Sequence, residues 1–188
     1  GKKKDCQNRS VVTTPTEIVK YMVDKTLSKV CEGKTPSEIL NISVADIACG
    51  SGIFLEEAFA YLQDYCVQWY ICNGQTDHLI ETGIDLYKLP LQEKKDILCS
   101  CIYGIDIDIH AVEVAKFSLL IKLIEDETAP SVSEVVPILP DLGDNIQFGN
   151  SLVSQTELNG ISGANRQMME IAPFDWSTIN NGCGFDVI

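Results

Sequence analysis

The stretch that decides the fold covers residues 43–59 and reads Ser-Val-Ala-Asp-Ile-Ala-Cys-Gly-Ser-Gly-Ile-Phe-Leu-Glu-Glu-Ala-Phe. A buried strand is expected over 44–48, followed by a turn at 49–52 and a helix that begins near residue 53. Gly50 can adopt a positive φ, and Gly52 lets another group approach the backbone closely. A strand that passes through Gly-x-Gly into a helix is typical of the ligand-binding corner of a doubly wound α/β sheet. We therefore expect this turn to hold a cofactor.

Composition limits the remaining possibilities. The 188 residues are enough for one domain with a proper core, and 45% of them are hydrophobic. The net charge of −13 argues against a surface that grips nucleic acid, although it does not exclude a cofactor-binding part whose DNA-facing surface lies elsewhere. The eight cysteines form no Cys-x-x-Cys pair and the chain has two histidines, so zinc-ligand spacing is absent. We expect a cytoplasmic protein without a membrane segment, because no signal peptide and no long apolar run occurs.

The part of the chain before the turn is expected to hold a basic arm and one helix. Residues 1–10 show no apolar periodicity, so we expect a flexible arm there and a single domain over 11–188. Thr14 and Glu17 have the spacing of a capping box, with Pro15 at the first helical position. Apolar residues then recur at helical spacing, which predicts a helix over 15–30.

The apolar patterns after the turn predict alternating helices and strands. Strands joined by helical crossovers pair in parallel with right-handed connections, so the expected fold class is α/β with a mostly parallel sheet of about four strands. Ligands of such sheets bind outside the carboxyl ends of the strands. The expected elements are a helix to about residue 72, two short helices within 75–100, a strand over 101–107, a helix over 109–125 with Asp108 as its N-cap, a strand over 146–149, a helix near Gln167 and the opening of a fourth strand at 185–188.

The turn differs from the dinucleotide fingerprint in two respects. Leu55 stands where the third glycine would be, and Asp46 on the strand would repel a pyrophosphate but suits an ammonium or sulfonium group. The longer sequence Asp-Ile-Ala-Cys-Gly-Ser-Gly resembles the S-adenosylmethionine site of adenine-N6 DNA methyltransferases from type I and fused type II restriction–modification systems. The resemblance implies a Rossmann-like methyltransferase fold with S-adenosyl-L-methionine as cofactor. At this turn it implies contacts from Asp46, Ala48, Cys49, Gly50 and Gly52.

Three further segments resemble motifs of the same family. Thr14 and Pro15 open a Thr-Pro-x-x-Ile-Val motif, whose threonine helps to hold the methionine carboxylate; alternatively, Thr14 only caps its helix. The resemblance makes Asp106 the acceptor for both ribose hydroxyls and places Ile107 against the adenine ring. Asn150 would contact the adenine amino group, or would be an ordinary turn residue after a strand.

The family's catalytic motif, a sequence of the Asn-Pro-Pro-Tyr type, does not occur in this chain, because none of its seven prolines follows an asparagine. Residues 172–176 and 184–188 resemble the family's approach to that motif. The resemblance spans about residues 8–188 but covers the N-terminal half of a catalytic domain. We therefore expect a fragment of a larger enzyme, to which we assign cofactor-binding residues but no catalytic residue and no metal ligand.

The function implied for the parent protein is transfer of a methyl group to adenine N6 in DNA, with most DNA contacts outside this chain and with specificity or restriction domains or subunits as partners. Two alternatives stay open: a methyltransferase of RNA, protein or a small molecule, and a non-catalytic cofactor-binding module. The isolated chain is expected to transfer nothing to DNA. Cys49 could be a nucleophile, but it lacks a basic neighbour in sequence and a packing role is the simpler interpretation.

Overall fold

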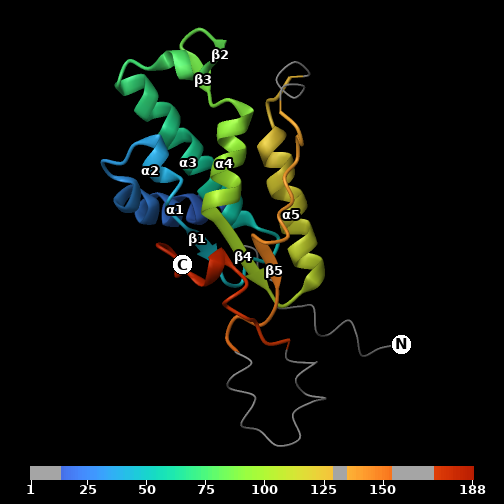
Figure 1. Ribbon diagram of the computed structural model, residues 1–188. Helices are drawn as coiled ribbons and strands as arrows, with labels where there is room; N and C mark the ends of the chain where they lie inside the picture. The colour runs from blue at the N-terminus through green and yellow to red at the C-terminus, as the bar shows by residue number, and fades with distance from the viewer. Residues whose placement is uncertain (1–13, 129–134, 154–171) are drawn as a thin grey trace, which may run out of the picture.

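The structure is a computed structural model that describes residues 14–128, 135–153 and 172–188 (Figure 1). The expected arm at 1–10 and the expected helix near Gln167 lie outside the described residues. The described part is a mixed α/β protein. Its elements, in chain order, are α1 (Thr16–Cys31), α2 (Pro36–Ile39), β1 (Val44–Asp46), α3 (Ile53–Cys72), η2 (Thr76–His78), β2 (Ile80–Gly83), β3 (Leu86–Lys88), α4 (Leu91–Cys101), β4 (Ile102–Asp106), α5 (Ile109–Ile124), β5 (Ile146–Phe148) and η3 (Asn180–Gly182).

The main sheet has three parallel strands in the order β1–β4–β5. Val44 lies opposite Ile102 in the β1–β4 pair, and Gly104 lies opposite Ile146 in the β4–β5 pair. On the free edge of β1, Val187 forms an isolated parallel bridge to Val44. The parallel sheet is confirmed, and the expected fourth strand is present as this single bridge. The carboxyl ends of β1, β4 and β5 therefore meet at one edge, as the alternating order of strands and helices predicts.

Each face of the sheet packs against a different part of the chain. One face joins α1, α3, α4 and α5 in a core that includes Phe59, Leu62 and Ile102, each fully buried. On the other face, Ile105 packs with Phe174 and Ile179 from the C-terminal segment, which lies beside the strands in Figure 1. The alternation of the β4 side chains between these two clusters explains its nearly continuous apolar sequence, because both of its faces are covered.

The first helix begins differently from the prediction. Helix α1 starts at Thr16 with Pro15 as its N-cap, and that cap has no side-chain hydrogen bond, so the expected capping box of Thr14 and Glu17 is wrong. The helix itself is confirmed: its buried residues recur every four positions and pack against α3. A capping box does form at Thr35, whose hydroxyl accepts from the N–H of Glu38 while the Glu38 carboxylate accepts from the N–H of Thr35.

The segment between the first two sheet strands is also corrected. Two short helices were expected within 75–100: α4 confirms one of them, but the 3₁₀ turn η2 and the antiparallel hairpin β2–β3 stand where the other was expected. Asp85, at the hairpin turn, has a positive φ of 57°. The hairpin side chains are exposed or half-buried on both faces, so the period-2 burial pattern that reveals a strand is absent from the sequence here.

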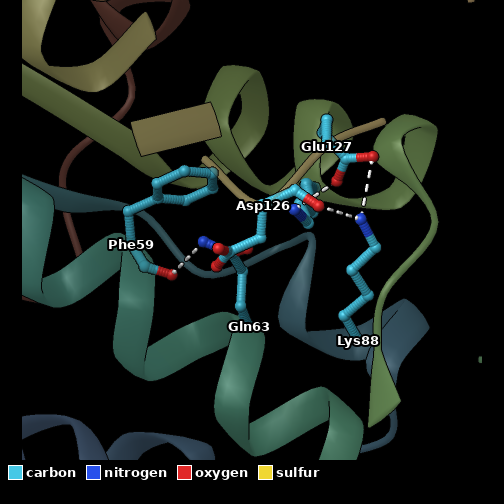
Figure 2. A network of polar contacts seen from close by, with 6 residues as sticks. Phe59, Gln63, Lys88, Asp126 and Glu127 are labelled. Atoms are coloured by element: carbon cyan, nitrogen blue, oxygen red, sulfur yellow. Dashed lines mark hydrogen bonds and ion pairs between the residues drawn. The ribbon is translucent and has the colours of Figure 1, made fainter. Parts of the chain in front are cut away.

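A buried ion-pair network fastens the hairpin to the helices (Figure 2). The Glu127 carboxylate, with 1% of its side chain exposed, lies 3.1 Å from the Lys88 ammonium and 2.5 Å from that of Lys94. Lys88 also donates to the carbonyl of Asp126 at 2.7 Å. Because these residues belong to β3, α4 and the segment after α5, the network holds the inserted hairpin against the core.

Every helix in the described residues is too short or too polar to cross a lipid bilayer.

Candidate functional site

The strand ends bring together residues that are far apart in sequence. We call the turn 47–52 together with Asp46 and Asp106 the acidic corner. The N–H of Cys49 donates to the carbonyl of Ile105 at 3.0 Å, which joins the turn after β1 to the end of β4. The N–H of Gly149 donates to the carbonyl of Asp106 at 2.9 Å, which joins the end of β5 to the same point. The corner is therefore a single structure built from three strand ends.

The two glycines of the turn have the roles that the sequence predicts, a positive φ at Gly50 and a close approach at Gly52. Gly50 has φ +53° and Gly52, the N-cap of α3, has φ +91°. A Cβ on Gly52 would lie 3.1 Å from the Cβ of Ala115 on α5, whereas a Cβ on Gly50 would meet nothing within 4 Å. Gly52 thus lets α5 approach the turn, while the space beside Gly50 is open.

Asp106 holds the turn in shape. Its Oδ2 accepts the N–H of Gly50 at 2.7 Å, and its Oδ1 accepts the N–H of Asp108 at 2.8 Å. The Asp108 carboxylate accepts the N–H of His110 at 2.9 Å and is the N-cap of α5, as predicted. A carboxylate oxygen has room for two acceptor contacts, so both oxygens of Asp106 keep capacity for another donor.

The acidic corner brings two carboxylates together in a partly desolvated environment. Burial raises the pKa of Asp46, and the neighbouring Asp106 raises it further, while the N–H of Ala48, which donates to Asp46 at 3.0 Å, opposes these effects. Burial, followed by Asp46 and Asp106, raises the pKa of the Cys49 thiol to about 12. A thiol with such a pKa stays protonated at neutral pH and is a poor nucleophile. Cys49 is 4% exposed and its sulfur faces Gly104, which agrees with the packing role inferred from the sequence.

The segment after β5 also reaches the corner, through a residue that the sequence did not single out. The Ser151 hydroxyl donates to the carbonyl of Ile47 in the turn at 2.7 Å. Asn150, one residue earlier, forms an isolated parallel β-bridge with Pro173. Its side-chain oxygen accepts the N–H of Leu152 at 3.1 Å. Only the proximity of a serine to the Asn150 motif could have indicated this contact, because 104 residues separate the two partners.

The other predicted site residues make no hydrogen bond to the turn among the described contacts. Ile107 follows Asp106 directly and is 56% exposed, so its side chain is open to a ligand at the corner. Thr14 and Pro15 precede α1, whose first bond runs from the N–H of Ile18 to the carbonyl of Pro15. Among the described contacts, none joins Thr14 to the turn.

Two cavities differ in their relation to the corner. A cavity of about 260 Å³ is lined by Asp46 and Ile47, by apolar residues of α1 and α3, and by Val187 and Ile188. A larger one of about 860 Å³ lies between α3 and the β2–β3 hairpin, beside the network of Figure 2. We place the site at the corner despite the difference in size, because ligands of parallel sheets bind at the carboxyl ends of the strands.

These features define an α/β protein with an acidic corner at the carboxyl ends of its parallel strands. Residues 26–161 match the family described as MmeI, DNA-methyltransferase domain. The type II restriction enzyme and methyltransferase RM.Eco57I of Escherichia coli is 44% identical over 181 residues, which cover 96% of this chain and 17% of that protein. The putative type II restriction enzyme and methyltransferase RM.MjaORFECS2P of Methanocaldococcus jannaschii is 34% identical over 122 residues, 65% of this chain and 9% of that protein.

The chain belongs to the MmeI-type DNA-methyltransferase domain family of restriction–modification proteins. The predicted membership of a restriction–modification methyltransferase family is thereby confirmed. The chain spans less than a fifth of the length of these two relatives.

Proposed function

We propose that this chain is the cofactor-binding part of a DNA methyltransferase that uses S-adenosyl-L-methionine and methylates adenine at N6. The fold assigned with this proposal is the Rossmann-like methyltransferase fold. The observation that carries the proposal is the acidic corner, where Asp106 joins the Gly50 turn to the end of β4 and Asp46 adds a second carboxylate. The rest of the proposal assigns the parts of one ligand to the residues around this corner.

The carboxylates of the corner, which accept hydrogen bonds, fit a cationic ligand that carries hydroxyl groups. Asp46 is partly desolvated and lies beside another carboxylate, so a ligand ammonium group nearby would relieve their repulsion. Asp106 can accept ribose hydroxyls on the lone pairs that the N–H groups of Gly50 and Asp108 leave free. The open space beside Gly50 and the turn through Ala48, Cys49 and Gly52 would border the methionine end.

The carboxylate end of the ligand has two candidate positions. The first helical bond of α3 runs from the N–H of Glu56 to the carbonyl of Gly52 at 2.8 Å. The N–H groups that precede it have no acceptor within the helix, so they can donate to a negative ligand group. Thr14 is the second candidate, supported by the finding that its hydroxyl does not cap α1, whose N-cap is Pro15. A hydroxyl that is not used for capping is available to a ligand.

The adenine end would lie beside Ile107 and Asn150. Ile107 offers an exposed apolar surface to a ring, and the Asn150 amide can donate through its nitrogen while its oxygen accepts the N–H of Leu152. When bound, S-adenosyl-L-methionine supplies a methyl group already activated on a sulfonium. The residues of this chain would therefore bind and orient it rather than transfer protons.

The target of transfer is proposed from the relatives. Both relatives carry the words restriction enzyme and methyltransferase in their names, which favours DNA over RNA, protein or small molecules as the substrate of the longer protein. The adenine-N6 assignment rests on the resemblance of the four motifs to that class of enzyme. Nucleoside analysis of DNA treated with a longer protein that contains this chain would test it: N6-methyladenine supports the assignment, and methylated cytosine alone refutes it.

Calorimetric titration of the 188-residue chain with S-adenosyl-L-methionine tests cofactor binding. We expect saturable binding that weakens by about tenfold in Asp106→Asn, because one carboxylate acceptor is replaced by an amide group. Asp141→Asn is a matched control, since Asp141 also accepts a backbone N–H two residues ahead, at 2.8 Å, but lies outside the corner. Absence of binding by the folded chain, or an equal loss in both variants, would contradict the proposal.

A further inference from the structure

The C-terminal segment is fastened to β1 by two polar side chains. Oδ2 of Asp186 accepts the backbone N–H of Ser43 at 2.8 Å and its hydroxyl at 3.0 Å. In return, the N–H of Asp186 donates to the carbonyl of Ser43 at 2.9 Å. Ser43 is 8% exposed, so these bonds form where water competes poorly and are stronger for it.

These contacts coincide with the point where the segment pairs with the sheet. The N–H of Val187 donates to the carbonyl of Ser43 at 3.1 Å, and the N–H of Ala45 donates to the carbonyl of Val187 at 2.9 Å. Apolar packing continues on either side: the ring of Phe185 lies 5.4 Å from that of Tyr103 on β4, and Val187 packs against the core on the other face.

Apolar packing alone does not select this register. The sequence Phe-Asp-Val-Ile at 185–188 offers apolar side chains to both faces, and a slip by one residue exchanges the faces. The bonds between Asp186 and Ser43 form in one register, because one carboxylate oxygen must reach both the N–H and the hydroxyl of the same residue. The polar pair therefore supplies the specificity that the apolar residues lack.

We infer that Asp186 and Ser43 form a side-chain clamp that sets the register of residues 184–187 against β1 and directs this segment toward the acidic corner. Val187 lies opposite Val44 in a parallel bridge, so the chain after Val187 runs in the direction in which β1 reaches Asp46. Ile188 and Asp46 already line the same cavity. Asp186 is a positioning residue in this account, and its importance for methyl transfer rests on the proposed function.

Amide hydrogen exchange of the 188-residue chain tests the clamp without any ligand. In Asp186→Ala, the amide of Ala45 should exchange on the order of tenfold faster, because two hydrogen bonds to a carboxylate are lost. Ser43→Ala and Asp186→Asn keep part of the clamp and should show a smaller acceleration. The amide of Gly104, which bonds to Asn145 on the other side of β4, should keep its rate.

Asp175→Asn provides the matched control, since Asp175 accepts two bonds from Ser177 in the same segment but does not contact β1. It should leave the Ala45 amide unchanged. Unchanged Ala45 exchange in Asp186→Ala would overturn the clamp, as would an equal acceleration at Gly104, which would indicate general loosening. If Asp186→Ala does not fold, the comparison of Asp186→Asn and Ser43→Ala with the control decides. A chain that keeps its clamp but does not bind S-adenosyl-L-methionine would refute the proposed function alone.

Discussion

Replacing Gly52 by alanine should destabilise the chain more than the same replacement at Gly50, although both glycines have positive φ. The added methyl group at Gly52 would lie 3.1 Å from the Cβ and 3.3 Å from the Cα of Ala115 on α5. At Gly50 it would meet nothing within 4 Å. The pair therefore separates the conformational cost of the turn from its contact with a neighbouring helix.

The expected magnitudes follow from these contacts. A left-handed conformation costs an alanine about 1–2 kcal/mol, and this is the whole expected effect of Gly50→Ala. Gly52→Ala should cost about 1–2 kcal/mol more, because the backbone of α5 cannot yield as the end of a flexible side chain would. Removing the methyl group of Ala115 in the variant Gly52→Ala/Ala115→Gly should recover the contact part.

Urea unfolding followed by circular dichroism measures each free energy of unfolding, provided that the m-value is unchanged. The four proteins formed by Gly52→Ala and Ala115→Gly make a double-mutant cycle in which we expect a coupling of about 1 kcal/mol. Ala115→Gly alone should cost about 1 kcal/mol, as glycine does within a helix. Equal costs at Gly50 and Gly52, or a cycle without coupling, would refute the contact between the turn and α5.

Three further predictions concern charge and reactivity. The raised pKa of Asp46 means that its ionised form destabilises the ligand-free fold. Asp46→Asn should therefore raise the free energy of unfolding at pH 7 but leave it unchanged at about pH 3, where Asp46 is protonated. The same variant should weaken S-adenosyl-L-methionine binding about tenfold by calorimetry. With a pKa of about 12, Cys49 should resist alkylation at about pH 8 while exposed Cys72 reacts, which peptide mass spectrometry measures. Glu127→Gln should destabilise the chain by about 3 kcal/mol in urea unfolding, because Lys94 is left buried without its carboxylate, and Glu127→Leu/Lys94→Met should recover part of the loss.

The sequence predicts the parts of this fold that depend on local patterns. Helices α3 and α5 follow from apolar residues at helical spacing, and the Gly50 turn follows from the strand and glycines around it. The β2–β3 hairpin does not, because its side chains are exposed or half-buried on both faces and Gly83 interrupts them. A short strand that buries neither face leaves little signal in a sequence.

Two Thr-Pro-x-Glu segments show why the cap of a helix is hard to predict. Thr14 and Glu17 have the same spacing as Thr35 and Glu38, yet only the second pair forms a capping box. Both segments satisfy the local requirement, so the four-residue motif alone does not decide whether the cap forms. A local motif states what can form, while the surrounding structure decides which bonds do form.

In the candidate site, too, the sequence predicts some residues but not the contacts between them. Asp46, Asp106 and Asn150 were predicted from the resemblance to the family's motifs, and each lies at or just after the carboxyl end of a strand, which parallel pairing brings to one edge. The bond from Gly50 to Asp106 spans 56 residues, and the one from Ser151 to the turn spans 104. Neither has a sequence spacing that could reveal it, because both depend on the order of strands in the folded sheet.

The measurement that tests the central claim most directly is a titration of the ¹⁵N-labelled chain with S-adenosyl-L-methionine, followed by amide chemical shifts in nuclear magnetic resonance. We predict saturable shifts at Gly50, Ile107 and Asn150, around the acidic corner. Shifts confined to residues such as Lys88 and Lys122, which line the larger cavity, would contradict this account. So would a folded chain whose amides do not respond to the ligand.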